Sequence, residues 1–236
     1  MKTLIIIPAY NEAENIIRTI SDIRLNVTNM DYVVINDCST DNTKELLKNN
    51  NINFLNLPIN LGIGGGVQTG YQYALEEEYD IAIQFDGDGQ HDARYISSLI
   101  KPIVSGEADF VIGSRFLQGK GFQSTSIRRL GINFLSQLIQ ILCKVKVYDV
   151  TSGMRAVNKK MIREFAINYA QDYPEPEAVL MAGLKGAHIL EIPVEMRERQ
   201  AGVSSINSLK SIYYMIKVSI SLIVLRMSTK RRKARI

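Results

Sequence analysis

Short apolar runs alternate with stretches of helical spacing over the first half of the chain. The apolar runs predict strands at residues 3–7, 32–36, 53–57, 81–85 and 108–113. Helices are predicted between them, at 11–24, from capping residues near 39–43 to about 49, from a glycine-rich loop at 60–66 to about 78, and at 93–104. Repeated strand–helix units of this length predict an α/β fold with a mostly parallel sheet flanked by helices.

The second half of the chain has a less regular pattern. Residues 116–125 are rich in loop-forming residues, 128–144 predict a long apolar helix, and 149–158 predict a turn that leads into a strand. Helices at 161–169 and 177–185 and a strand at 189–194 follow. We expect all of these elements to belong to one domain, residues 1–205.

Residues 206–236 have a different pattern, which predicts an amphipathic helix and a basic tail. A narrow polar stripe is formed by Lys210, Tyr214, Lys217 and Ser221. The apolar face is formed by Leu209, Ile212, Tyr213, Ile216, Ile220, Ile223 and Met227. The apolar stretch is shorter than the ~20 residues that span a bilayer, so we expect attachment to a membrane surface. The alternative is a helix that packs on the domain or on another subunit.

Charge and cysteine content limit the classes of binding partner and the cellular compartment that fit this chain. The net charge is +4, but Lys230, Arg231, Arg232, Lys233 and Arg235 lie together at the C-terminus, so the rest of the chain is close to neutral. This distribution argues against a nucleic-acid-binding surface and favours a local basic contact. Cys38 and Cys143 lack metal-ligand spacing and suggest a reducing compartment, and the apolar run at the N-terminus is too short for a signal peptide.

Asp86 and Asp88 carry the most informative chemistry. They follow the predicted strand 81–85 directly, with Gln90 and His91 after them. Two adjacent carboxylates repel each other unless a cation lies between them, and Mg²⁺ or Mn²⁺ commonly binds one or two carboxylates together with phosphate oxygens. The alternative is an acidic Asp-Gly turn. His91 is interpreted either as a structural cap or as a ligand.

Several segments together resemble family 2 glycosyltransferases of the GT-A fold, and among them the polyprenyl-phosphate sugar synthases of the dolichyl-phosphate-mannose synthase type. They occur in the family's order over residues 3–205. The segments are Pro8-Ala-Tyr-Asn-Glu12, Asn36-Asp-Cys-Ser-Thr-Asp41, Asn60-Leu-Gly62, Asp86-Gly-Asp-Gly-Gln-His91, Gly113-Ser-Arg-Phe116, Asp149-Val-Thr-Ser-Gly153 and Arg199-Gln-Ala-Gly-Val-Ser204.

The resemblance implies a binding site for a nucleotide-sugar. Asp37 would accept a hydrogen bond from the imino N–H of the base, which favours UDP- or GDP-sugars over ADP-sugars. Asp86, Asp88 and Gln90 would hold Mg²⁺ or Mn²⁺ at the diphosphate, and Arg199 would contact the same phosphates. The full donor-binding set is Pro8, Tyr10, Glu12, Asp37, Gly62, Asp86 and Arg199. The glycines at 62–66 are interpreted as a tight turn that permits close backbone approach, not as a dinucleotide fingerprint.

The residues that would bind the acceptor are predicted less directly than those that would bind the donor. Arg115 matches a family motif and would bind an acceptor phosphate together with Arg128 or Arg129, although that pair also suits the solvated start of a helix. Glu175 and Glu177 lie where the family places acidic residues that face the acceptor, and would supply a base for a hydroxyl acceptor. The alternative for this stretch is a rigid linker, since two prolines predict an extended, stiff segment. Ser204-Ser205 departs from the Ser-Lys common in the family, which removes one cationic phosphate contact.

The resulting hypothesis is a metal-dependent, inverting transferase of a hexosyl or N-acetylhexosaminyl group. It would move the sugar from a UDP- or GDP-sugar to a polyprenyl phosphate of the undecaprenyl type, at the cytoplasmic face of a membrane, for polysaccharide or glycoconjugate assembly. Two alternatives stay open: extension of a lipid- or protein-linked glycan, and a non-catalytic scaffold that binds nucleotide-sugar and regulates a membrane partner. A small membrane protein and a second copy of the chain are further candidate partners, and nucleic acid is not expected.

Overall fold

The computed structural model describes residues 1–119, 126–197 and 208–233. One seven-stranded sheet organises the described chain, in the order β3-β2-β1-β4-β6-β5-β7. Strand β6 is antiparallel to β4 and β5, and the other neighbouring pairs are parallel. The strands are β1 (Thr3–Ala9), β2 (Asp31–Asn36), β3 (Phe54–Asn56), β4 (Ile81–Gln84), β5 (Phe110–Ser114), β6 (Arg155–Asn158) and β7 (Ile189–Pro193). The prediction of an α/β fold with a mostly parallel sheet is confirmed.

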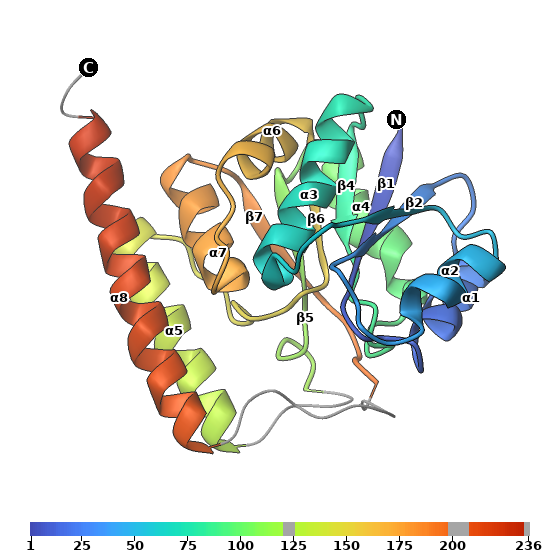
Figure 1. Cartoon of the computed structure of the whole chain (residues 1–236). Helices are drawn as coiled ribbons and strands as arrows, with labels where there is room; N and C mark the ends of the chain where they lie inside the picture. Colours follow the sequence, from blue (N-terminus) through green and yellow to red (C-terminus); the bar gives the residue numbers. More distant parts are fainter. Residues whose placement is uncertain (120–125, 198–207, 234–236) are drawn as a thin grey trace.

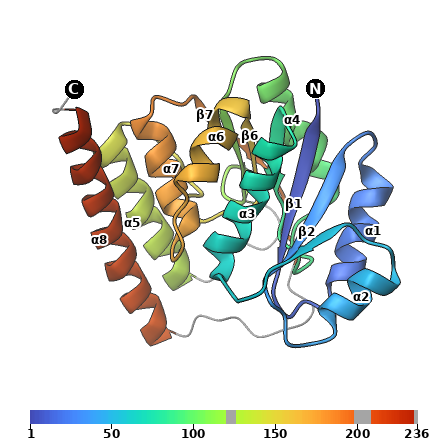
Figure 2. The ribbon, with the colours of Figure 1, turned by 45° about the horizontal axis from the view of Figure 1, so that its top comes forward.

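Helices cover both faces of this sheet (Figures 1 and 2). Leu4 and Ile6 of β1 contribute to one hydrophobic cluster, and Ile5 and Ile7 to the other. Successive side chains of a strand point to opposite faces, so a strand buried on both faces reads as a continuous apolar run. The helices are α1 (Ile16–Asn26), α2 (Thr43–Asn49), α3 (Gly62–Glu76), α4 (Ile96–Val104, preceded by the 3₁₀ turn Ala93–Tyr95), α5 (Ser126–Cys143), α6 (Lys159–Ile167), α7 (Pro174–Leu184) and α8 (Ser208–Lys233).

The glycine-rich segment differs from the prediction. It was expected to form a loop, but α3 begins at Gly62, and the next glycines form its first turns. A Cβ atom on Gly64 would collide with the carbonyl oxygen of Ala170, and one on Gly70 would collide with Ile6 of β1. The glycines therefore allow close backbone approach, as expected, but inside a helix that packs against its neighbours.

The proline-rich segment also differs from the prediction. Pro174 and Pro176 were expected to hold an extended segment, but they lie in the first turn of α7. The first N–H groups of a helix have no partner within the helix, and proline has the fixed φ that a first turn requires. Proline therefore starts this helix, and Glu175 and Glu177 point in different directions from its first turn.

Helices α5, α7 and α8 pack together beside the sheet (Figure 1). Val218 and Leu222 of α8 are fully buried, which agrees with the alternative of a helix packed on the domain. Three residues of the predicted polar stripe face the start of α7: Tyr214 and Lys217 lie at the Tyr173 ring, and Ser221 Oγ donates a hydrogen bond to Glu177 Oε1 at 2.7 Å. Five residues of the predicted apolar face are exposed, as the membrane-surface prediction requires: Tyr213, Ile216, Ile220, Ile223 and Met227. The described helices include none that is both long enough and apolar enough to cross a bilayer.

Candidate active site

A first cavity of about 780 Å³ lies at the carboxyl ends of β1, β2 and β4. This is the edge where open α/β sheets bind ligands. The walls combine the loop after β1, the loop after β2, the start of α3 and the turn after β4. Most of the predicted donor-binding residues line it, together with the predicted metal ligand Asp88: Pro8, Tyr10, Glu12, Asp37, Gly62 and Asp86.

Side-chain hydrogen bonds hold two of these loops together. Asn11 has a left-handed backbone (φ 56°), and its Oδ1 accepts the N–H of Thr40 at 2.8 Å. Asp41 accepts the Ala13 N–H at 3.1 Å and the Thr43 N–H at 3.0 Å. Burial works to raise the pKa of Asp41, but the bonds from Thr43 and Ala13 lower it overall. The carboxylate is thus stabilised as an anion that fixes the loop geometry.

Asp37 lines the first cavity and is buried. Its Oδ1 accepts the Leu61 N–H at 2.7 Å, and its carbonyl oxygen accepts Asn60 Nδ2 at 3.1 Å. These bonds join the end of β2 to the start of α3. A carboxylate has two oxygens and about four lone pairs, so it retains capacity to accept a further N–H from a ligand.

Backbone and side-chain bonds fix the turn that carries the two aspartates. The Asp86 N–H donates to His91 Nδ1 at 3.0 Å, and Asp88 Oδ1 accepts the Gln90 N–H at 3.0 Å. His91 is buried beside Phe85, with its Nε2 3.5 Å from Asp86 Oδ2. Of the two interpretations of His91, this geometry favours the structural cap. The Gln90 side chain lies toward the Arg197 carbonyl, with Nε2 at 3.5 Å from that oxygen.

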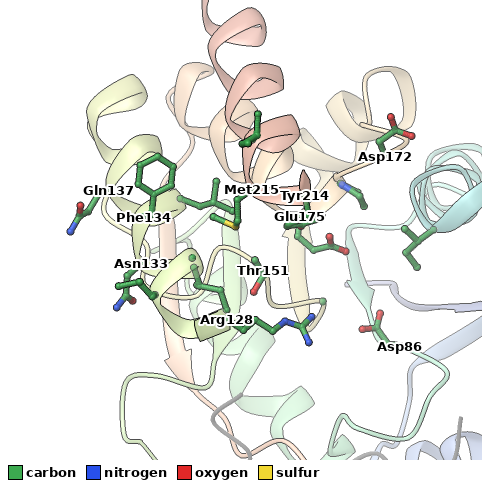
Figure 3. A pocket seen from close by; sticks show the side chains of 18 residues that line it. Asp86, Arg128, Asn133, Phe134, Gln137, Thr151, Asp172, Glu175, Tyr214 and Met215 are labelled. Atoms are coloured by element: carbon green, nitrogen blue, oxygen red, sulfur yellow. The ribbon is translucent and has the colours of Figure 1, made fainter. Parts of the chain in front are cut away.

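A second cavity of about 860 Å³ meets the first at Asp86 and Ile63 (Figure 3). Asp86, Arg128, Thr151 and Glu175 provide polar groups at one end. The other end lies between α5 and α8 and is mostly apolar: Leu130, Phe134, Met215 and Ile216 line it, beside the amides of Asn133 and Gln137 (Figure 3). One carboxylate therefore borders two spaces of different polarity.

The structure separates the three arginines predicted to bind an acceptor phosphate. Arg128 lines the second cavity. The Arg129 guanidinium lies over the Phe116 ring, 4.6 Å from its centroid. Arg115 makes a two-pronged contact with Asp149, with Nε–Oδ2 and Nη2–Oδ1 both at 2.7 Å. Burial works to lower the pKa of Arg115, but Asp149 raises it overall. Geometry favours Arg128 as the arginine that meets a ligand in this cavity.

The two predicted glutamates are separated in the same way. Glu175 lines the second cavity (Figure 3), whereas Glu177 faces α8 and lines neither cavity. Burial raises the pKa of Glu175; the charge of Arg155 opposes this, and that of Asp86 adds to it. A carboxyl with a raised pKa is suited to carry a proton nearer neutral pH. Glu175, not Glu177, has the position that a base would need.

Sequence patterns missed several residues of the site. Asn15 and Asn42 line the first cavity, and Asp172 lines the second, without a predicted role in the site. Isolated polar residues give no periodic signal, so only the fold reveals their position. Arg199 lies outside the described residues. Its neighbour Arg197 is anchored beside the aspartate turn, because its N–H donates to the Gln90 carbonyl at 2.8 Å and its guanidinium pairs with Asp22 and Asp92.

The donor set at this turn fits a hard divalent cation that completes its coordination with ligand oxygens. No cluster of three or more His, Cys, Asp or Glu side chains suited to a metal occurs among the described residues. Asp86 and Asp88 both line the first cavity, and two carboxylates beside a space large enough for phosphates are the kind of site that Mg²⁺ uses. Gly153 leaves the room that the Asp86 carboxylate occupies, because a Cβ atom there would collide with Asp86 Oδ2.

Comparison with known proteins identifies the family. The family model described as Glycosyl transferase family 2 matches residues 4–165, more than half of the chain. The chain belongs to glycosyl transferase family 2. The predicted resemblance and the assignment as a glycosyltransferase are therefore confirmed.

Relatives of this family 2 glycosyltransferase include enzymes named for polyprenyl-phosphate acceptors. An undecaprenyl-phosphate mannosyltransferase of Micrococcus luteus is 27% identical over 216 residues, which cover 88% of each chain. A UDP-N-acetylglucosamine–dolichyl-phosphate N-acetylglucosaminyltransferase of Methanococcus voltae is 31% identical over 217 residues, with 81% of this chain and 84% of the relative covered.

Solved structures support the fold. The glucosyl-3-phosphoglycerate synthase of Mycobacterium tuberculosis, in complex with Mn²⁺, UDP and phosphoglyceric acid, has a TM-score of 0.72. It is 19% identical, and the match covers 95% of this chain and 78% of that chain. The likeness confirms a GT-A-like glycosyltransferase fold.

Proposed function

We propose that this glycosyltransferase moves a sugar from a UDP- or GDP-sugar to a polyprenyl phosphate, with inversion and with Mg²⁺ or Mn²⁺ as cofactor. The observation that carries the proposal is the meeting of two cavities at Asp86. One cavity is polar and lined by loops at the carboxyl end of the sheet. The other continues from polar groups into an apolar space.

The first cavity suits the nucleotide-sugar. Asp37 lines it with lone pairs that can accept a base N–H, and Asp86 and Asp88 line it where they would meet a diphosphate. Bound between the two aspartates, a divalent ion would neutralise charge that develops on the departing diphosphate. The likeness to a structure that holds Mn²⁺ and UDP supports this assignment.

The second cavity suits an amphipathic acceptor. A prenyl phosphate has an anionic oxygen near neutral pH, so it attacks the anomeric carbon without a strong base. Arg128 can hold the phosphate, and the apolar lining contributed by Leu130, Phe134 and Ile216 can cover the first part of the prenyl chain. Relatives named for undecaprenyl and dolichyl phosphate acceptors support this choice.

A second candidate is transfer to a glycan hydroxyl. Such an acceptor needs a general base, and Glu175 borders the same cavity as Asp86 with a raised pKa. The apolar lining favours the lipid acceptor, since a glycan would leave that surface uncovered.

We further propose that the enzyme attaches peripherally to the cytoplasmic face of a membrane. Helix α5 adds Leu130, Phe134 and Ile141 to the exposed apolar residues of α8. Four residues of the basic cluster, Lys230 to Lys233, belong to the C-terminal end of α8, and each cationic side chain near an anionic bilayer contributes about 1 kcal/mol. An amphipathic acceptor could then reach the second cavity directly from the lipid.

Product analysis tests the transfer reaction. Purified protein is incubated with Mg²⁺ or Mn²⁺, undecaprenyl phosphate and a panel of radiolabelled UDP- and GDP-sugars. Asp88→Ala is the test variant, and Glu107→Ala is the control because Glu107 is an exposed carboxylate at the opposite end of the sheet. We expect a labelled lipid that is cleaved by mild acid, requires metal, and is lost only in the Asp88 variant.

Two other outcomes would contradict the proposal in different ways. Donor binding without lipid product, but with transfer to an oligosaccharide, would assign the second candidate function. Full activity of the Asp88 variant, or activity in excess chelator, would contradict the proposed metal site.

A further inference from the structure

Arg155 is a fully buried arginine that sequence patterns gave no reason to select. It is the first residue of β6 and pairs with Gln84 of β4 across the sheet. Removing a guanidinium from water costs several kcal/mol, so a buried one needs hydrogen-bond partners. No ion pair of Arg155 is found among the described residues. Its hydrogen-bond partners are backbone carbonyl oxygens, and its guanidinium also lies 5.6 Å from the centroid of the Phe110 ring.

These carbonyl oxygens belong to the two walls of the second cavity. Arg155 Nε donates to the Ser152 carbonyl at 2.5 Å, and Nη2 donates to the Val150 carbonyl at 3.1 Å. Arg155 Nη1 donates to the carbonyl of Glu175 at 2.9 Å. One guanidinium therefore joins the loop that precedes Gly153 to the first turn of α7.

Both walls contact groups at the reacting end of the cavity. Gly153 abuts the Asp86 carboxylate, and Thr151 and Glu175 line the cavity beside it (Figure 3). A shift of either wall would move the Asp86 carboxylate or the groups that face the acceptor. A guanidinium can span these three carbonyls because its donors form a rigid planar fork, whereas an ammonium is a compact point charge.

We propose that Arg155 is a positioning residue for sugar transfer, which clamps the loop 150–152 and the first turn of α7 at the separation that Asp86 and the acceptor require. This inference rests on the proposed function for the reaction it serves. It differs from a general structural role, because the fork acts on two specific backbone segments of the cavity.

Arg155→Lys tests the clamp, because lysine keeps the positive charge but cannot hold all three carbonyls. Val157→Ala is the matched control: Val157 lies two residues along the same strand, is fully buried, and has no contact with either wall in the hydrogen-bond network. We expect kcat of the lysine variant to fall at least about tenfold, since ~1 Å of misplacement can cost ~100-fold. The donor KM should change less than kcat, because Asp37 and the loops after β1 and β2 make no contact with the clamp, whereas Asp86 is shared by both cavities.

Hydrogen–deuterium exchange supplies a readout that does not depend on activity. In the lysine variant, exchange should rise in peptides that cover 149–153 and 173–177, and remain unchanged in β1, β2 and β4. Equal loss of kcat in Val157→Ala, or a rise in exchange throughout the sheet, would show that Arg155 only stabilises the fold. Unchanged exchange at both walls would overturn the clamp itself. If wild type forms no lipid product, the proposed function fails, and the exchange result still tests the clamp.

Discussion

Among single residues, the contact between Gly153 and Asp86 predicts that a side chain at position 153 would displace the Asp86 carboxylate. A Cβ atom on residue 153 would lie 3.0 Å from Asp86 Cγ and closer still to Oδ2. Gly153→Ala should therefore displace the carboxylate and lower kcat by about 10- to 100-fold, because small shifts of reacting groups are costly. Steady-state kinetics with the donor and acceptor measure this loss.

Gly183→Ala is the control for crowding without proximity to the site. A Cβ atom on Gly183 would lie 2.7 Å from Cys143 Sγ, and Gly183 lines neither cavity. This variant should lose thermal stability but retain kcat. Retained activity in Gly153→Ala would mean that the Asp86 position is not critical.

The placement of candidate site residues could be predicted from the sequence where carboxylates directly follow buried strands. Asp37, Asp86 and Asp88 follow buried strands, and parallel strands bring their carboxyl ends to one edge, so their meeting in one cavity follows from the pattern. Arg155 could not be found this way. Its role depends on the antiparallel placement of β6 and on backbone carbonyls, and neither leaves a sequence signal.

At the scale of elements, Asp109 joins three strands at the end of the sheet opposite the site. Its Oδ2 accepts the His188 N–H at 2.9 Å, just before β7, and its Oδ1 accepts Asn158 Nδ2 at 2.7 Å, at the end of β6. Lys160 Nζ lies 3.5 Å from the same carboxylate. Burial works to raise the pKa of Asp109, but these partners lower it below the ordinary value of 3.8.

This lowered pKa predicts the direction of a pH effect on stability. The unfolded chain binds the proton more readily, so the contribution of Asp109 is present above about pH 3.8 and is lost as pH falls through the lower pKa of the folded state. Asp109→Asn should cost about 1–2 kcal/mol in the free energy of unfolding at pH 7, in line with loss of charged hydrogen bonds. The difference from wild type should shrink below pH 3.8.

Urea denaturation at pH 7, 5 and 3 measures both parts of this prediction. Activity should be unaffected where the variant is folded, because Asp109 lines neither cavity. A stability difference that stays constant across these pH values would show that the charge of Asp109 contributes nothing.

Element boundaries were predicted well where burial dictates them and poorly where tertiary packing does. Strand β4 was expected at 81–85 and spans Ile81–Gln84, since a short apolar run buried on both faces is typical of a central strand. The glycines of α3 have a low helix propensity and favour a loop locally. Gly64 and Gly70 nevertheless lie within a helix, because they let it pack closely against neighbouring segments.

In the molecule as a whole, helices α5 and α8 lie on the side away from α1 and α2 (Figures 1 and 2), and both carry exposed apolar residues. The helical spacing of α8 predicted its exposed face, but not its supporting contacts. Those contacts come from α5 and α7, which are distant in sequence. Because Leu130, Phe134 and Ile216 are also part of the second cavity, the exposed surface and the cavity are continuous.

This continuity predicts that membrane binding and use of a lipid acceptor weaken together. Ile220→Glu places a charge on an exposed face of α8 without touching either cavity, and Leu25→Glu is the control on α1, where Leu25 is exposed on another side of the molecule. Burying a side chain such as isoleucine contributes about 1.5–3 kcal/mol, so the α8 variant should bind anionic vesicles at least about tenfold more weakly. Co-sedimentation with vesicles of phosphatidylglycerol and phosphatidylcholine measures the affinity. Transfer to undecaprenyl phosphate in the same vesicles should fall in parallel, while transfer to a short-chain, water-soluble prenyl phosphate should be unchanged. Equal vesicle binding by the two variants would contradict attachment through α8, and reduced transfer to the water-soluble acceptor would show that the substitution damages the active site instead.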